Sequence, residues 1–228
     1  QLFDRSQVLD QLRPPAHAPE FSRVFAARTC MMAGVGLTGV FLWYLVRFWV
    51  YGKAVVLTSA PLTIPAGFLI AGMAVATLIG AALASWAAGP ISESIEEKNI
   101  PVARAVAGAC LLYAAGLALA WGLGVWSTGT ARENGMLLFA LISGFAFGIY
   151  DSLGLELVMD SLPDPRRAGH DLGIYALANS AGLALAAIIG ALLVNAFEHS
   201  FGYYLLFPSA IVMVLLAGII TLTTKSAE

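Results

Sequence analysis

The sequence has little charge. Charged residues make up 11% of the 228 positions and hydrophobic residues make up 59%, whereas a soluble globular chain has roughly 45–50% apolar and about 25% charged residues. A water-soluble core of this size could not bury so much apolar surface, so we expect lipid to cover much of it. The net charge of −2 is too small to indicate a nucleic-acid partner.

Cysteine and histidine are also scarce. The chain has two cysteines and three histidines, and their spacing matches neither a metal site nor a disulfide framework. Cys30 and Cys110 fall inside apolar runs, where a free cysteine behaves as a small hydrophobic residue. The sequence also lacks the glycine patterns that bind phosphates or dinucleotides, and the motifs of serine and zinc hydrolases. We therefore expect no cofactor and no enzymatic activity.

Six apolar stretches each exceed the roughly 20 residues that a helix needs to cross the hydrocarbon core of a bilayer. They cover residues 25–50, 63–89, 101–126, 135–162, 165–197 and 201–224. The pattern predicts an all-α, polytopic membrane protein with six transmembrane helices. The polar, proline-containing lead at 1–22 is expected to be a linker, and short connections make residues 23–228 one bundle.

The distribution of basic residues predicts the orientation, because cytoplasmic loops carry an excess of lysine and arginine. The side that holds both termini collects nine basic residues: Arg5, Arg13, Arg23, Arg28, Lys98, Arg104, Arg166, Arg167 and Lys225. The other side collects three: Arg47, Lys53 and Arg132. We expect an integral protein of the plasma (inner) membrane with both termini in the cytoplasm.

The fourth stretch carries three acidic residues, Asp151, Glu156 and Asp160. Ionisable groups in a spanning helix are costly and usually serve a function. Asp151 lies nine residues, or about 13 Å, from Asp160 at roughly 1.5 Å per residue, which places it near the midplane. Two interpretations stand for Asp151. It stays protonated or bonds to a neighbouring helix, or it binds a proton or substrate at a central cavity, where burial would tune its proton affinity.

Polar groups near the cytoplasmic end of the bundle also allow two interpretations. Glu156 and Asp160 share one helix face, and they either form a hydrated helix end or a gate that pairs with Arg166, Arg167 or Arg104. Asn179 lies well inside the fifth stretch, where its amide either holds helices together or contacts substrate.

Small residues recur at four-residue spacing in two of the stretches. This spacing lets helix backbones approach closely within a membrane. It occurs at Ala178, Gly182, Ala186 and Gly190 in the fifth stretch, and at Gly144 and Gly148 in the fourth. It predicts tight packing between neighbouring helices, and it also permits helices that slide or rock against a partner during a transport cycle.

The segment from Tyr150 to Asn179 resembles helices ten and eleven of major facilitator superfamily transporters. The resemblance rests on Asp-Ser-Leu-Pro at 160–163, on Ala-Gly-His-Asp-Leu-Gly-Ile at 168–174, and on Ala-Asn at 178–179. It is nearest the glycoside or sugar-cation symporter branch, and the lead-in at 21–28 is similar to the entry to helix seven of that branch. The chain as a whole resembles the C-terminal six-helix half of such a twelve-helix transporter.

The resemblance implies a proton-coupled secondary transporter for a small polar solute, which could be sugar-like. Asp151, Tyr150 and Asn179 would line the path of substrate and protons. The cytoplasmic gate would consist of Glu156, Asp160, Arg166, Arg167 and Asp171. A second six-helix half is the implied partner, either upstream of Gln1 in the same polypeptide or in another subunit.

Two features depart from that branch. Gly154 stands where such transporters often carry an acidic residue, and the 89–99 loop has few basic residues where the family typically has a basic, glycine-containing pattern. These departures favour an alternative hypothesis, a non-transporting, transporter-like subunit that scaffolds a membrane complex.

Overall fold

The computed structural model describes residues 19–51, 64–126, 130–162, 168–197 and 199–224, and within them all regular structure is helical. Six helical segments are long and apolar enough to cross a membrane, which confirms the predicted fold class. The elements, in chain order, are α2 (Pro19–Gly39), α3 (Leu42–Tyr44), the π-helix η1 (Leu45–Val50), α4 (Ile64–Glu97), α5 (Val102–Trp126), α6 (Thr130–Asp160), α7 (Ala168–Ala196) and α8 (His199–Leu222).

The first span is not one continuous helix. α2 begins at Pro19, inside the predicted linker, because proline is tolerated in a first helical turn. It ends at Gly39, and α3 and η1 continue the span after a turn at Val40 and Phe41. In η1 the helix widens, so that the N–H of Tyr51 donates to the carbonyl of Val46 at 3.2 Å.

The second span is longer than predicted. α4 continues as helix through Pro90 to Glu97, so most of the predicted 89–99 loop is helical. Asn99 ends it with a φ of 51°, a left-handed conformation that asparagine tolerates after a helix. The N–H of Ile100 donates to the carbonyl of Ile95 at 2.9 Å and that of Asn99 to the carbonyl of Glu96 at 3.1 Å. This pair of hydrogen bonds is the Schellman motif.

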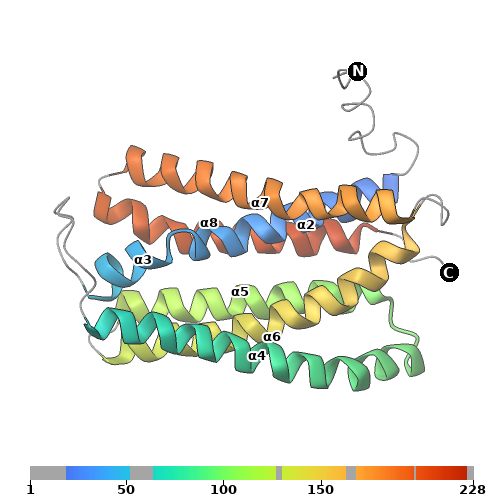
Figure 1. Ribbon diagram of the computed structural model, residues 1–228, viewed down its shortest axis with the longest axis horizontal. Helices are drawn as coiled ribbons and strands as arrows, with labels where there is room; N and C mark the ends of the chain where they lie inside the picture. Colours follow the sequence, from blue (N-terminus) through green and yellow to red (C-terminus); the bar gives the residue numbers. More distant parts are fainter. Residues whose placement is uncertain (1–18, 52–63, 127–129, 163–167, 198, 225–228) are drawn as a thin grey trace, which may run out of the picture.

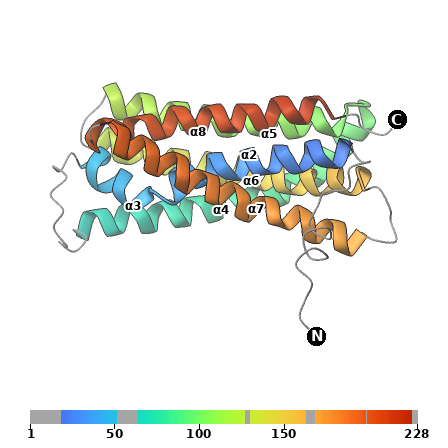
Figure 2. The same ribbon diagram turned by 90° about the horizontal axis from the view of Figure 1, so that it is seen from above.

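The spans form two groups of three helices. α2 packs on α7 and α8, and α6 packs on α4 and α5, so the two groups lie above and below one another in Figure 1. Contacts of α5 with α8, and a smaller set of α2 with α6, join them. α5 and α8 line one side of the bundle, and the starts of α4 and α7 lie away from that side (Figure 2).

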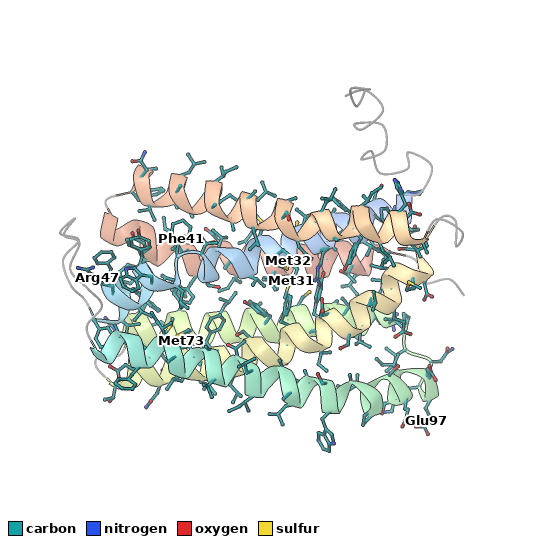
Figure 3. All side chains as sticks on the ribbon, in the orientation of Figure 1. Met31, Met32, Phe41, Arg47, Met73 and Glu97 are labelled. Atoms are coloured by element: carbon teal, nitrogen blue, oxygen red, sulfur yellow. The ribbon has the colours of Figure 1, made fainter. Side chains whose placement is uncertain are left out.

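The chain enters and leaves the bundle at the same end. There Arg23 of α2 donates to the carbonyl of Thr223 after α8 at 3.0 Å, and Val24, Ala103 and Leu157 pack together. At the opposite end Arg132 of α6 donates to the carbonyl of Trp49 at 3.0 Å. Arg47 and Glu97, which are labelled in Figure 3, lie at opposite ends of the bundle.

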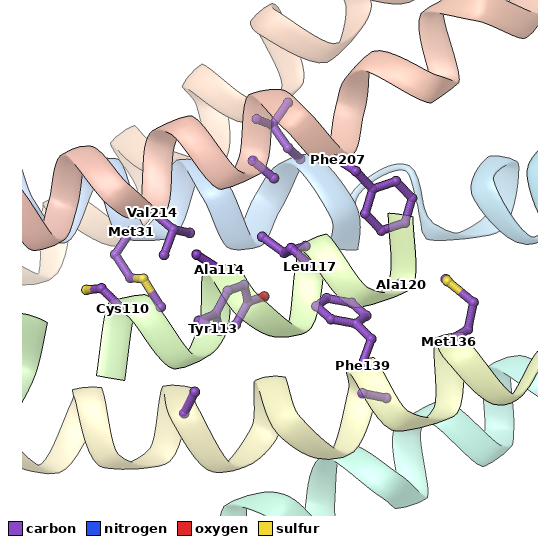
Figure 4. Packing of buried hydrophobic residues seen from close by; sticks show 14 of the residues in the cluster. Met31, Cys110, Tyr113, Ala114, Leu117, Ala120, Met136, Phe139, Phe207 and Val214 are labelled. Atoms are coloured by element: carbon purple, nitrogen blue, oxygen red, sulfur yellow. The ribbon is translucent and has the colours of Figure 1, made fainter. Parts of the chain in front are cut away.

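Aromatic side chains fill the centre where α5, α6 and α8 meet (Figure 4). The ring of Phe139 lies 6.0 Å from that of Tyr113, edge to face, and 6.4 Å from that of Phe207. Leu117 and Phe207 are fully buried here. This packing ties the group of α4, α5 and α6 to α8.

Glycines permit the closest helix approaches. A Cβ at Gly144 of α6 would collide with the backbone of Thr77 on α4, and one at Gly182 of α7 would lie 2.6 Å from the carbonyl oxygen of Thr29 on α2. Every residue of the predicted small-residue stripe on α7 is buried. The predicted packing role of these small residues is therefore confirmed.

Candidate functional site

One arginine joins three spans near the middle of the bundle. Nη1 of Arg28 on α2 lies 2.7 Å from Oδ1 of Asp151 on α6, and Nε of Arg28 donates to Oδ1 of Asn179 on α7 at 2.8 Å. A guanidinium carries five N–H donors in a fixed plane, so it can hold an acceptor on each neighbouring helix at once. We call Arg28, Asp151 and Asn179 the central polar site.

Aromatic rings surround the guanidinium of this site. The Cζ of Arg28 lies 5.5 Å from the ring centroid of Phe147, 5.6 Å from that of Tyr150 and 5.7 Å from that of Tyr175. A cation within about 6 Å of an aromatic ring is attracted by its electron-rich face. The rings therefore compensate part of the cost of taking this charge out of water.

The two charged partners differ sharply in exposure. The side chain of Arg28 is 9% exposed, whereas that of Asp151 is 56% exposed. Ile142 of α6 packs against Gly116 of α5, so the helix face that carries Ile142 faces α5. Asp151 follows Ile142 by nine residues, and at roughly 100° per residue its side chain points about 180° away from α5. The buried member of the pair is thus the arginine, and the carboxylate faces the side of the bundle away from α5.

The three members of the site lie at matching depth. Arg28 is 28 − 19 = 9 residues from the start of α2, Asp151 is 160 − 151 = 9 residues from the end of α6, and Asn179 is 179 − 168 = 11 residues from the start of α7. These offsets correspond to about 14–17 Å at 1.5 Å per residue. The three residues therefore lie at a similar height in the bundle, nearer the end that holds the chain termini than the opposite end.

The structure brings together the three residues predicted to line a path. Asp151 and Asn179 both contact Arg28 directly, and Tyr150 is buried against its guanidinium. The interpretation that Asp151 bonds to a neighbouring helix is confirmed. Asp151 is exposed and the arginine that it contacts is buried, and the role of Asp151 in binding a proton or substrate stays a prediction.

Sequence reasoning missed the role of Arg28. It was assigned to the cytoplasmic side, and the structure corrects this, because α2 begins six residues earlier than predicted and carries Arg28 into the bundle. A signal was present in the sequence, since Arg28 lies in an apolar run and Asp151 offered it an opposite charge within the membrane. Without Arg28 the basic residues divide eight to three between the two sides.

The described members of the predicted gate lie near the end of the bundle that holds the chain termini. Asp160 is exposed at the end of α6, and Glu156 is half-buried one turn deeper. Asp171 is buried in the first turn of α7, and its Oδ1 lies 3.2 Å from Nδ1 of the exposed His170. Arg166 and Arg167 lie outside the described residues, so the gate stays a prediction.

A second polar cluster fastens η1 to the start of α6 at the opposite end. Arg132 donates to the backbone of Trp49, and Glu133 lies close enough to Tyr51 to influence its phenol. Burial and the neighbouring Glu133 raise the pKa of Tyr51 above its usual value. The widened end of the first span is therefore held by neighbouring residues of α6.

Comparison of the chain with family models, with curated proteins and with solved structures finds no match.

Proposed function

We propose that this chain forms one six-helix half of a proton-coupled secondary transporter for a small polar solute, of the major facilitator type. The observation that carries the proposal is the ion pair between Arg28 and Asp151 within the spans, joined to Asn179. Charged groups within spanning helices are rare and mark substrate or proton paths. We assign the coupling role to Asp151, because it is the exposed member of the pair.

The order of helix contacts supports this type of transporter. The first three spans, α2, α4 and α5, correspond in order to the last three, α6, α7 and α8. Under this correspondence, the contacts of α2 with α7 and α8 match those of α6 with α4 and α5. The contact of α7 with α8 lacks a counterpart of similar extent. α2 and α6 run in opposite directions, so the relation is that of inverted repeats, between which transporters build their binding sites.

The exposure of α4 and α7 supports a second half as partner. Only 22% of the residues in the most apolar part of each helix are buried, against 39–50% in the other four spans. α7, α2, α6 and α4 follow one another in contact order, and Asp151 belongs to the middle of this row. A partner that packs on α4 and α7 would enclose Asp151 while leaving a path beside it.

The proposed orientation follows from the basic residues. By sequence position, and without Arg28, eight of them fall in or beside the segments predicted for the side with the chain termini, against three for the other side. This excess favours a cytoplasmic position for both termini in the plasma (inner) membrane.

The test uses the native protein in liposomes that contain a pH-sensitive dye. Pools of neutral, anionic and cationic small solutes are added outside, and we expect one pool to cause internal acidification. Asp151→Asn is expected to abolish acidification while leaving solute exchange across the membrane. Glu97→Gln, at an exposed position far from the site, is the matched control.

Two outcomes contradict the proposal. Acidification that persists in Asp151→Asn would remove the proton-binding role. A protein that moves no pool, yet co-purifies with a stable set of membrane subunits, would instead favour the scaffold alternative. Thermal unfolding of each variant separates lost transport from lost folding.

A further inference from the structure

We propose that the second half of the transporter is a second copy of this chain, which packs on α4 and α7 about a twofold axis perpendicular to the membrane. This inference rests on the proposed function, which requires a second six-helix half, and it names that partner. In this arrangement α4 of each copy lies against α7 of the other copy. Two equivalent contacts therefore close the dimer, as twofold symmetry requires.

α4 presents a face of small side chains away from its own bundle. A Cβ at Gly80 would collide with the backbone of Leu141 on α6, so Gly80 faces α6. Leu78 lies two residues earlier, about 200° around the helix at roughly 100° per residue, and is exposed. Exposed residues continue this face at spacings of three and four, and all except Leu78 are small: Ala71, Ala74, Leu78, Ala82, Ser85 and Gly89.

α7 repeats this pattern. Gly182 faces the backbone of α2 at Thr29, and Ser180 lies two residues earlier, on the opposite side of the helix. Exposed residues continue the face, and all of them are small: Gly169, Gly173, Ala176, Ser180, Ala184 and Ala187. Small residues are enriched where membrane helices pack closely on other helices. Both faces therefore suit contact with protein, although only 22% of the most apolar part of either helix is buried within the chain.

The two small-residue faces match each other when the helices run in opposite directions. α4 ends and α7 begins at the end of the bundle that holds the chain termini, so a twofold axis perpendicular to the membrane pairs them antiparallel. If Gly89 of one copy lies opposite Gly169 of the other, the spacings of all six positions on each face agree. The large side chain of Leu78 then lies opposite the small one of Ser180. The chain is thus complementary to itself in one register.

Charge favours the same register. Glu96 follows Leu78 by 96 − 78 = 18 residues, which is a whole number of turns at roughly 100° per residue, so it continues the small-residue face of α4. Glu93 and Glu96 are exposed and lie just past the first residue of α7 of the other copy. The first N–H groups of a helix carry partial positive charge and attract anions. Lys98, two residues after Glu96, lies on the other side of the helix at this spacing.

The second copy would also enclose the central polar site. The carboxylate of Asp151 is 56% exposed within one chain, and α7, α2, α6 and α4 follow one another in contact order. The twofold axis that places α4 opposite α7 places α6 opposite α2 of the other copy. Asp151 then faces the space between the two copies, so the site is incomplete in a single chain.

Disulfide crosslinking in native membranes tests this arrangement. Cys30 and Cys110 are first replaced by alanine, and two differently tagged forms of the full chain are expressed together. One form carries Ala82→Cys and the other carries Ala176→Cys. Because a disulfide requires Cα atoms within about 7 Å of each other, oxidation should join the two forms to one another, and neither form to itself. Ala82→Cys with Ala115→Cys, at an exposed position of α5, is the matched control and should give no crosslink.

A second measurement tests the register. Ser180→Leu would place leucine against Leu78 of the other copy, so the dissociation constant of the dimer should rise at least about tenfold through overpacking. Energy transfer between labelled copies in liposomes, at decreasing protein density, measures this constant. Ala118→Leu, at an exposed position of α5, should leave it unchanged. Ser180 is exposed within its own chain, and thermal unfolding of each variant checks that folding is retained.

The outcomes separate this inference from the proposed function. A crosslink of Ala82→Cys to itself, or an unchanged dissociation constant in Ser180→Leu, overturns the arrangement. Crosslinks from α4 and α7 that reach only protein of a different sequence overturn the second copy and leave the transporter in place. A dimer that forms as expected, yet moves no solute pool, contradicts the proposed function and leaves the dimer in place.

Discussion

The carboxylate of Asp151 is 56% exposed, although the guanidinium that it contacts, that of Arg28, is only 9% exposed. When the pair is broken, the two charged side chains therefore differ in whether they can find another partner. Asp151 can turn to water or to a partner protein, whereas Arg28 is confined between three helices. The effect of a substitution should depend on which member is removed.

Removal of the carboxylate is expected to destabilise the bundle more than removal of the arginine. Asp151→Asn leaves a buried cation, which costs about 3–5 kcal/mol when its partner is lost. Arg28→Met replaces the cation with an apolar side chain and leaves an exposed carboxylate, so we expect a loss of about 1 kcal/mol or less. Thermal unfolding in detergent measures both, and a larger loss for Arg28→Met would contradict the assignment of burial.

Gly144 and Gly154 offer a matched pair on α6. Alanine at Gly144 would collide with the backbone of Thr77, whereas a Cβ at Gly154 meets open space. Gly144→Ala should therefore lower stability by about 1–3 kcal/mol through overpacking. Gly154→Ala should raise it by about 0.5–1 kcal/mol, because alanine favours the helix. Equal melting temperatures for the two variants would show that α4 and α6 are not in close contact.

Tyr51 should make stability depend on alkaline pH. Burial and Glu133 raise its pKa in the folded state above the ordinary value of about 10. A raised folded pKa gives stability that is present below the unfolded pKa and is lost as pH rises through the folded pKa. Ultraviolet titration should show a phenol that ionises later than free tyrosine, and Glu133→Gln should move its pKa back towards the ordinary value. Tyr51→Phe should remove the part of the dependence that Tyr51 contributes, and an unchanged titration in Glu133→Gln would disprove the contact.

Photo-crosslinking can test the proposed second half directly. A photoreactive amino acid at Val75 of α4 or Leu177 of α7, which are 56% and 43% exposed, should crosslink to further protein helices in native membranes. The same probe at Leu119 of α5 or Leu216 of α8, which are 38% and 40% exposed, should label lipid. Lipid labelling at all four positions would argue against a partner on α4 and α7.

Much of the fold could be predicted because long apolar runs and small-residue spacing act locally. The six spans and the stripe from Ala178 to Gly190 follow from such patterns. The break after Gly39 and the helical turn through Pro90 could not be predicted, because tertiary contacts at Trp49 and the motif at Asn99 determine them. Two members of the central polar site could be predicted, because Asp151 and Asn179 are polar residues in apolar helices. The position of Arg28 depends on where α2 begins, and helix ends are weakly encoded.

The grouping of the spans also sets an order of assembly during biosynthesis. α4, α5 and α6 are made in succession and pack mainly on one another, so they can associate as soon as they enter the membrane. Among the described helices, α2 precedes the other spans but packs on α7 and α8, which follow them. Its arginine therefore enters the bilayer long before Asn179 exists, and Asp151 on α6 is the first permanent counter-charge to arrive. Until then, water, lipid headgroups or the insertion machinery must stabilise the charge of Arg28 on α2.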